Sequence, residues 1–332
     1  MPRPEFFLAA VAQKKVLEFV GLSRYQSIFG VPLSCVRPLL GATSVAIAAI
    51  SVGACGRSGG PSADAGAQPS SSAAPSASAP FVMNATPFSE DSVRQQVNPK
   101  NEQPYSGPTG TVRGVVSIKG DPPPVLAEVV EKIPDKCKPA RAVYGRLFRE
   151  GMVRSLADVL VTVTEYQGFV PAKGQTVILN TEGCAFPGRT IALTYGQRID
   201  VLSKDGEPYV PKLMGGQMRA DMIAVPGGSA VKLYPHVPGR YTLIDQMHLF
   251  MTADVFVLKY ATFDVTGLDG KFEISGVPVG EVSVNALLPS IMATTQQKVK
   301  VEEGKTVELN LELEFDAKKL EKPKKPPKVK IH

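Results

Sequence analysis

Three side chains that can bind metal ions follow one another at intervals of three residues: Asp245, His248 and Met251. Thioethers are soft ligands suited to Cu(I), and imidazole binds copper and zinc. One interpretation is a copper site that uses His248, Met251 and the methionines nearby in the sequence, which are Met214, Met218, Met222 and Met247. A second is that Asp245 and His248 hold a harder ion, Cu(II) or Zn(II). A third is that the methionines fill an irregular core or face a partner, and that His248 is a loop residue without a metal.

The sequence offers little that could perform acid–base or nucleophilic catalysis. It contains three histidines, of which only His248 is a plausible base, and no nucleophile stands at a meaningful spacing from it. There is no glycine-rich phosphate loop and no His-Glu-x-x-His motif. We therefore expect that the protein is not an enzyme and carries no cofactor, with copper as the one alternative.

The formal net charge of +6 is concentrated at the two ends of the chain. Residues 1–54 carry +3 and residues 315–332 carry +5, whereas residues 55–314 carry −2. A mildly acidic middle argues against a basic face that binds nucleic acid. The lysines of residues 315–332 alternate with prolines, which predicts an extended tail. That tail either contacts an anionic surface or is simply a solvated end.

An uncharged stretch near the amino terminus has the pattern of an export signal. Leu39–Ala54 is apolar or small throughout and follows Arg37. Its 16 residues are fewer than the roughly 20 that a transmembrane helix needs. The stretch ends in Val52-Gly-Ala-Cys55-Gly56, which resembles a bacterial lipobox. The alternatives are an ordinary signal peptide and an anchor helix in which Cys55 is incidental.

The lipobox resemblance implies that residues 1–54 are a signal peptide and that Cys55 carries diacylglycerol and an amino-terminal acyl chain such as palmitate. Several acyl chains on one residue anchor a protein stably. Gly56 in place of Asp implies the outer membrane, with the protein facing the periplasm or the cell surface. Residues 56–80 contain 22 Gly, Ala, Ser or Pro out of 25, so residues 55–110 are expected to act as a tether.

From residue 111 onward, short runs of alternating or β-branched residues recur with Gly, Pro, Asp and Asn between them. Asp269-Gly270 is typical of a tight hairpin turn. No run has the pattern of an amphipathic helix, so we predict an all-β protein made of antiparallel β-sandwiches. The expected strands are 111–118, 159–164, 176–180, 190–193, 198–202, 230–234, 240–244, 254–259, 263–266, 271–274, 281–287, 298–302 and 306–312.

Two of the four cysteines remain in the folded region, because Cys35 leaves with the signal and Cys55 is the anchor. An even remainder in an exported chain predicts a disulfide between Cys137 and Cys184. The alternatives are two free buried thiols and a pair of thiolate metal ligands. Neither cysteine has a His or a second Cys two to four residues away, which disfavours a zinc site.

Two stretches together resemble exported cupredoxin-like (plastocyanin-like) proteins: Asn180-Thr-Glu-Gly-Cys-Ala-Phe-Pro187 and Pro238-Gly-Arg-Tyr-Thr-Leu-Ile-Asp245 with the residues through Val255. Such proteins hold copper with a Cys, a His three residues later, a Met three further, and an earlier His. His248 and Met251 match the later His and the Met. Asp245 stands at the Cys position, and Tyr209 aligns with the earlier His. The resemblance implies a cupredoxin-like domain over residues 111–260 that has lost its blue-copper site.

A further stretch, Phe263-Asp-Val-Thr-Gly-Leu-Asp-Gly270 and its continuation through Gly280, resembles the carboxypeptidase regulatory-like (transthyretin-like) module. It implies a smaller prealbumin-like β-sandwich over residues 261–314. Residues 111–120 resemble the first strand of that module and could contribute it. Carboxypeptidase activity does not follow, because the module lacks the catalytic zinc domain.

Together these patterns predict a membrane-anchored envelope lipoprotein whose cupredoxin-like domain is a non-catalytic binding or scaffolding module. The alternative is a copper-binding or copper-carrying periplasmic protein that uses His248, Met251 and nearby methionines. The expected partners are the lipid bilayer, through acylated Cys55, and an envelope protein or anionic surface contacted by the sandwich or the tail. No nucleic acid is expected.

Overall fold

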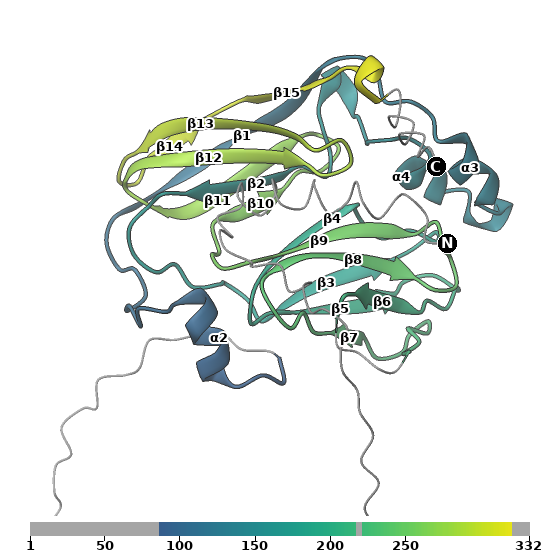
Figure 1. Ribbon diagram of the computed structural model, residues 1–332, viewed down its shortest axis with the longest axis horizontal. Coiled ribbons are helices and arrows are strands. Elements are labelled where there is room, and N and C mark those ends of the chain that lie inside the picture. Colours follow the sequence, from purple (N-terminus) through teal and green to yellow (C-terminus); the bar gives the residue numbers. More distant parts are fainter. Residues whose placement is uncertain (1–85, 217–220, 321–332) are drawn as a thin grey trace, which may run out of the picture. The chain divides into compact units, whose positions relative to one another are not determined.

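The computed structural model describes residues 86–216 and 221–320, which form two β-sandwiches and a few short helices (Figure 1). The signal, Cys55, Met218 and the tail beyond residue 320 lie outside the described residues. Within the described ranges, no helix is long and apolar enough to cross a bilayer.

The expected all-β fold is confirmed, because 15 strands and only short helices make up the described residues. The helices are α2 (Glu90–Val97), α3 (Ala127–Lys132) and α4 (Ala140–Tyr144), with 3₁₀ turns at Asp135–Cys137, Met152–Arg154 and Ala317–Leu320. The strands are β1 (Thr109–Gly120), β2 (Leu160–Thr164), β3 (Thr176–Thr181), β4 (Thr190–Thr194), β5 (Arg198–Ser203), β6 (Pro211–Met214), β7 (Val231–Leu233), β8 (Gly239–Asp245), β9 (Thr252–Leu258), β10 (Phe263–Val265), β11 (Lys271–Pro278), β12 (Gly280–Leu288), β13 (Ala293–Val301), β14 (Thr306–Glu308) and β15 (Leu311–Phe315).

The first sandwich takes its strands from both sides of residue 260. One sheet has the order β11-β1-β14, with β15 also paired to β1, and the other has the order β10-β2-β12-β13. Alternate side chains of β1, among them Val112 and Val116, point into a core that also contains Val161, Phe272 and Val284. Strand β1 therefore pairs with three strands from the carboxyl-terminal part of the chain, β11, β14 and β15.

The expected strand 306–312 is divided into β14 and β15, and Gly114 of β1 shows why. A Cβ atom added at Gly114 would lie 1.9 Å from the backbone oxygen of Leu309, so the chain approaches β1 more closely there than any side chain allows. The side chain of Asn310 accepts a hydrogen bond from the Val115 N–H, at 3.1 Å. This side-chain hydrogen bond replaces a backbone hydrogen bond between neighbouring strands, so the parallel pairing with β1 is interrupted there. The pairing resumes at Leu311.

The second sandwich consists of the sheets β3-β5-β7 and β4-β9-β8-β6. Its core is formed by side chains from both sheets, including Leu193, Ile199, Leu243 and Val255. Strands β3 and β5 pair in parallel, as do β4 and β9, whereas the sequence pattern predicted antiparallel pairing. Side-chain alternation is the same in both kinds of sheet, so the pattern alone does not set strand direction.

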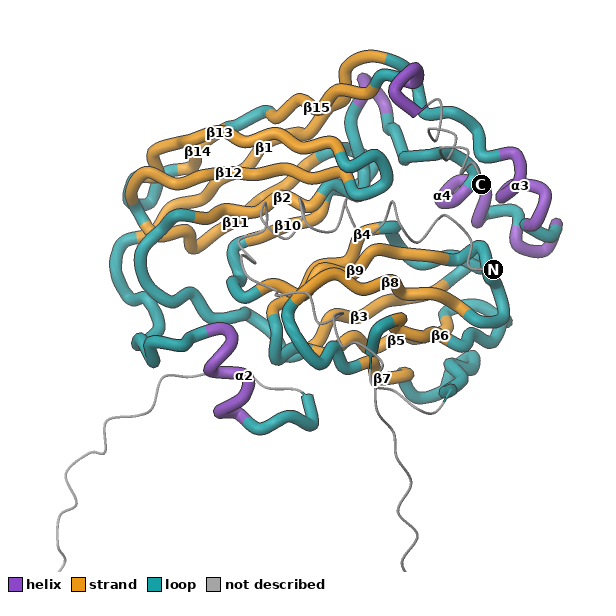
Figure 2. Tube along the Cα trace, in the orientation of Figure 1, coloured by secondary structure: helices purple, strands orange, loops and turns teal. Residues whose placement is uncertain are grey.

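The short helices lie outside the strand layers (Figure 2), and two of them contribute to the second core. Val93 of α2 and Tyr144 of α4 are buried there. Ser89 is the N-cap of helix α2, and its side chain accepts a hydrogen bond from the Ser92 N–H at 3.3 Å. Ser89 followed by the acidic residues Glu90 and Asp91 is the sequence signal for the start of this helix.

Strands β2, β12, β4 and β9 bury both of their faces. One face of each belongs to the core of its own sandwich, and the other contributes to a third cluster formed by Leu160, Ala192, Phe256, Leu258 and Leu287. This double burial explains why β2 and β4 are buried along almost their whole length rather than at every second residue.

A buried ion pair fixes the chain beside this third cluster. The guanidinium of Arg149 donates two hydrogen bonds to Asp158, at 2.6 and 2.7 Å, and both side chains are largely buried. Asp158 also accepts a hydrogen bond from the Arg189 N–H at 2.8 Å, and its backbone oxygen accepts one from the Thr190 hydroxyl at 2.7 Å. One carboxylate therefore connects the segment before β2 with the start of β4.

Asp158→Asn is expected to lower the free energy of unfolding by about 3–5 kcal/mol, because it leaves the buried Arg149 cation without a counter-ion. Chemical denaturation of purified protein measures this change. The matched control is Asp269→Asn, since Asp269 forms an exposed pair with Lys271 and should alter stability little. Equal effects of the two substitutions would contradict the assignment.

Candidate functional site

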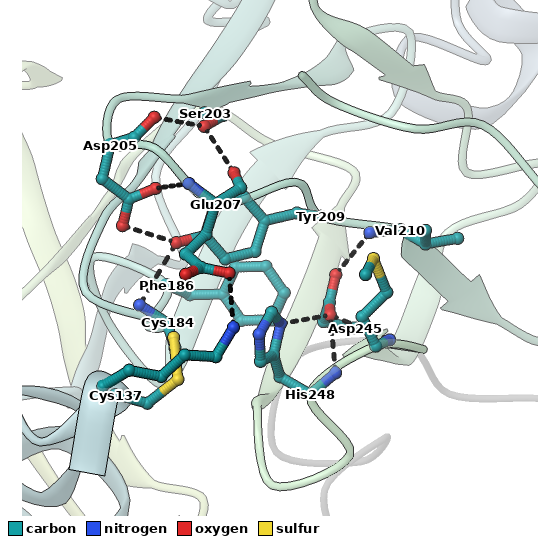
Figure 3. Close-up of polar contacts among 12 residues, drawn as sticks. Cys137, Cys184, Phe186, Ser203, Asp205, Glu207, Tyr209, Val210, Asp245 and His248 are labelled. Carbon is teal, nitrogen blue, oxygen red and sulfur yellow. Dashed lines mark hydrogen bonds and ion pairs between the residues drawn. A yellow bond between two sulfur atoms is a disulfide. The ribbon is translucent and has the colours of Figure 1, made fainter. Parts of the chain in front are cut away.

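The loop between β8 and β9 is built around the carboxylate of Asp245, the last residue of β8. Asp245 is completely buried. Its Oδ1 accepts hydrogen bonds from the N–H groups of Met247 and His248, at 3.0 and 2.8 Å (Figure 3). Its Oδ2 accepts one from the Val210 N–H at 2.6 Å. The residue at the expected cysteine position is therefore a structural acceptor that closes the loop and holds it to the chain before β6.

His248 is the buried base of this loop, with a side chain that is 7% exposed. Its Nδ1 lies 2.9 Å from Asp245 Oδ1. Because a carboxylate oxygen accepts hydrogen bonds, the Nδ1–H group is the donor of this bond. This leaves the lone pair on Nε2, to which no described residue makes a hydrogen bond. The ring also contacts the ring of Tyr209, with centroids 5.5 Å apart, and that of Phe250, at 5.9 Å.

Tyr209, at the expected position of the earlier histidine, is a buried hydrogen-bonding phenol. Its hydroxyl donates to Asp205 Oδ2 at 2.7 Å and accepts from the Cys184 N–H at 3.2 Å. Burial raises the pKa of Tyr209, and the hydrogen bond to Asp205 raises it further, so the phenol stays neutral. Burial also acts to raise the pKa of Asp205, but hydrogen bonds from Tyr209 and from backbone N–H groups outweigh it and lower that pKa.

The methionines of the copper interpretation are divided between the core and the surface. Met251 is fully buried within the core of the second sandwich. Met214, Met222 and Met247 are exposed. The structure thus brings His248 and Asp245 into direct contact, and it separates the buried Met251 from the exposed Met214, Met222 and Met247.

Cys137 and Cys184 form the predicted disulfide, which connects the 3₁₀ turn Asp135–Cys137 to the loop after β3. Both cysteines are completely buried. The two sulfur atoms and one nitrogen of His248 all lie within 4.8 Å of one another. Figure 3 shows the imidazole between Asp245 and the disulfide. The sequence gives no sign of this proximity, because no short spacing relates Cys137 to His248.

A cavity of about 640 Å³ lies beside His248. Its walls are mainly apolar and come from α3, from the segment that follows it and from the β8–β9 loop. The residues that form it are Val129, Lys132, Pro134, Lys136, Glu207, Met247, His248, Leu249 and Phe250. Leu249 is 77% exposed, and Lys136 pairs with Glu207 at 2.8 Å. The apolar run Met247-His-Leu-Phe-Met251 within a loop was the one sequence signal for this surface.

Comparisons with known proteins identify structural neighbours only. No protein-family model matches the chain, and no curated protein matches it. Amicyanin from Paracoccus versutus is 17% identical over 29% of this chain and 96% of its own length, with a TM-score of 0.23. A Cu-containing nitrite reductase from Thermus scotoductus is 14% identical over 28% of this chain, with a TM-score of 0.22. This chain spans about a quarter of the nitrite reductase, 24% of its length.

Asp245→Asn is expected to lower the free energy of unfolding by about 2–4 kcal/mol, because an amide presents N–H groups where buried N–H donors need an acceptor. Thermal or chemical denaturation measures the loss. Asp221→Asn is the matched control, since Asp221 is exposed and, among the described residues, bonds only the side chains of Lys212 and Gln246. A loss no larger than that of the control would show that Asp245 does not hold the loop.

Proposed function

We propose that this protein is a lipid-anchored envelope lipoprotein whose second sandwich is a non-catalytic binding module. The observation that carries the proposal is the apolar cavity beside His248. Its volume of about 640 Å³ lies within the usual range for ligand sites. The exposed side chains of Met247 and Leu249 both line this cavity, and an exposed apolar patch of this kind marks an interaction site.

The residues at the ligand positions of a copper site support a role without blue copper. Asp245 replaces the thiolate, and both of its oxygens accept hydrogen bonds. Tyr209 is a neutral phenol bonded to Asp205. A blue-copper site needs a thiolate and two imidazoles in one trigonal arrangement, and these two positions supply neither. The alternative, a copper carrier, would retain only His248 and Met251 among the four ligand positions of a blue-copper site.

The chemistry of the cavity indicates the kind of partner. Val129, Leu249 and Phe250 offer aliphatic and aromatic contacts, and Lys132 adds an exposed cation at the margin. Among the described residues, Lys132 has no ion-pair partner. We therefore propose an amphipathic segment of an envelope protein, with apolar side chains in the cavity and an acidic group beside Lys132.

Photo-cross-linking in cells tests this site. A photoreactive phenylalanine analogue at position 249 is expected to form a discrete adduct, and the same analogue at Leu268 is the control. Leu268 is also exposed but lies in the turn between β10 and β11. Met247→Asp, which places a charge in the cavity wall, should reduce the adduct at 249 at least about fivefold. Adducts of equal yield at both positions, or none at 249, would refute the proposed surface.

Lipid anchoring rests on the lipobox-like residues and has its own test. Cells labelled with radioactive palmitate are expected to incorporate label into the wild-type chain and not into Cys55→Ser. Membrane fractionation should find the substituted chain released from the outer membrane. Cys35→Ser is the matched control, because that residue lies within the expected signal. Label retained in Cys55→Ser would exclude this residue as the acylation site.

A further inference from the structure

Three buried side chains from separate parts of the fold meet beside the cavity: Cys137, Cys184 and His248. Their ligand atoms all lie within 4.8 Å of one another. The two cysteines are fully buried and His248 is nearly so. Because the thiolate is the ligand that binds metals, the cluster has no capacity for a metal while the two sulfurs are joined.

We propose that the dithiol form of Cys137 and Cys184, together with Nε2 of His248, binds one thiophilic d¹⁰ cation, Zn(II) or Cu(I), and that the disulfide form does not. This ligand set differs from the Asp245, His248 and Met251 set that the sequence suggested. It also goes beyond the proposed binding module, and neither proposal requires the other.

The imidazole is oriented as a metal-binding histidine. In many metal sites the ligating histidine donates its other ring N–H to a carboxylate, which fixes the tautomer and makes the ligand nitrogen more basic. Asp245 accepts from Nδ1 of His248 in this way, at 2.9 Å. The carboxylate is itself held by the N–H groups of Val210, Met247 and His248. Nε2 is left as the nitrogen with an available lone pair.

The distances suit a soft cation once the sulfurs separate. With Zn–S bonds near 2.3 Å and Zn–N bonds near 2.0–2.1 Å, neighbouring ligand atoms of a tetrahedral site lie about 3.5–3.8 Å apart. The cluster therefore reaches this geometry through side-chain movements of about 1 Å, given the present limit of 4.8 Å. Thiolate sulfur and imidazole nitrogen favour Zn(II) and Cu(I) over harder ions. His248 also lines the cavity, so a fourth ligand could enter from there.

The change between the two forms is a thiol–disulfide exchange. An external dithiol gives two electrons and two protons to the Cys137–Cys184 bond, which breaks, and the reductant becomes a disulfide. The cation then replaces the two thiol protons, which are released to water. Oxidation and metal binding are therefore mutually exclusive states of the same two sulfurs.

Metal titration of the full chain, purified in detergent, tests the proposal in both redox states. After reduction by a phosphine without oxygen, one equivalent of Zn(II) is expected to bind in competition with a chromophoric chelator. Co(II) in place of Zn(II) should give the intense visible absorption of tetrahedral thiolate coordination. The oxidised chain should bind at least about a hundredfold more weakly and show no such absorption. Circular dichroism confirms that the reduced chain with metal is folded.

Three substitutions identify the ligands. In the reduced chain, His248→Ala is expected to weaken binding at least about tenfold, and His236→Ala, the matched control on a different turn, should not. Met251→Leu preserves the volume of the core, so it separates this site from a copper site that uses Met251. Unchanged affinity in Met251→Leu supports the proposal. Equal binding by oxidised and reduced chain, unchanged affinity in His248→Ala, or a reduced chain that stays unfolded with metal overturns it.

Discussion

The buried carboxylate of Asp245 determines the arrangement of the site. It accepts hydrogen bonds from three backbone N–H groups and from one imidazole nitrogen, and no solvent reaches it. A buried carboxylate is tolerated when each of its oxygens accepts a hydrogen bond, and here the loop after β8, the residue before β6 and His248 supply the donors. The position of His248 beside the disulfide and the cavity is a consequence of this one group.

A second chain of contacts ties the other half of the site to the same place. The hydroxyl of Tyr209 connects Cys184 with Asp205, and Tyr209 packs against the ring of His248. The disulfide brings in Cys137 from the helical segment between β1 and β2. Elements from three separate stretches of sequence thus converge on one imidazole. The partners of this imidazole are also linked to one another, through the disulfide and through the hydrogen bond from the Cys184 N–H to Tyr209.

The sequence revealed those features that depend on local pattern or on simple counting. Alternating and β-branched runs identified most strands, and the even number of cysteines in the folded region identified the disulfide. Parallel pairing of β4 with β9 was not predictable, because alternation carries no information on direction. The function of Asp245 was also hidden. Its type suggested a ligand, whereas its hydrogen bond from Val210 comes from a residue whose proximity only the folded chain shows.

The order of the strands has a consequence for how the chain folds after synthesis. Every strand of the second sandwich, β3 to β9, lies in one continuous stretch between β2 and β10 of the first. The second sandwich can therefore assemble as soon as its own residues are available. Strands β1 and β2 must wait for β10 to β15 before they find their partners. Such distant pairings form slowly and expose unpaired strand edges meanwhile. The first sandwich is thus the last to close, and the amino-terminal strand β1 is the part of the chain most in need of protection until then.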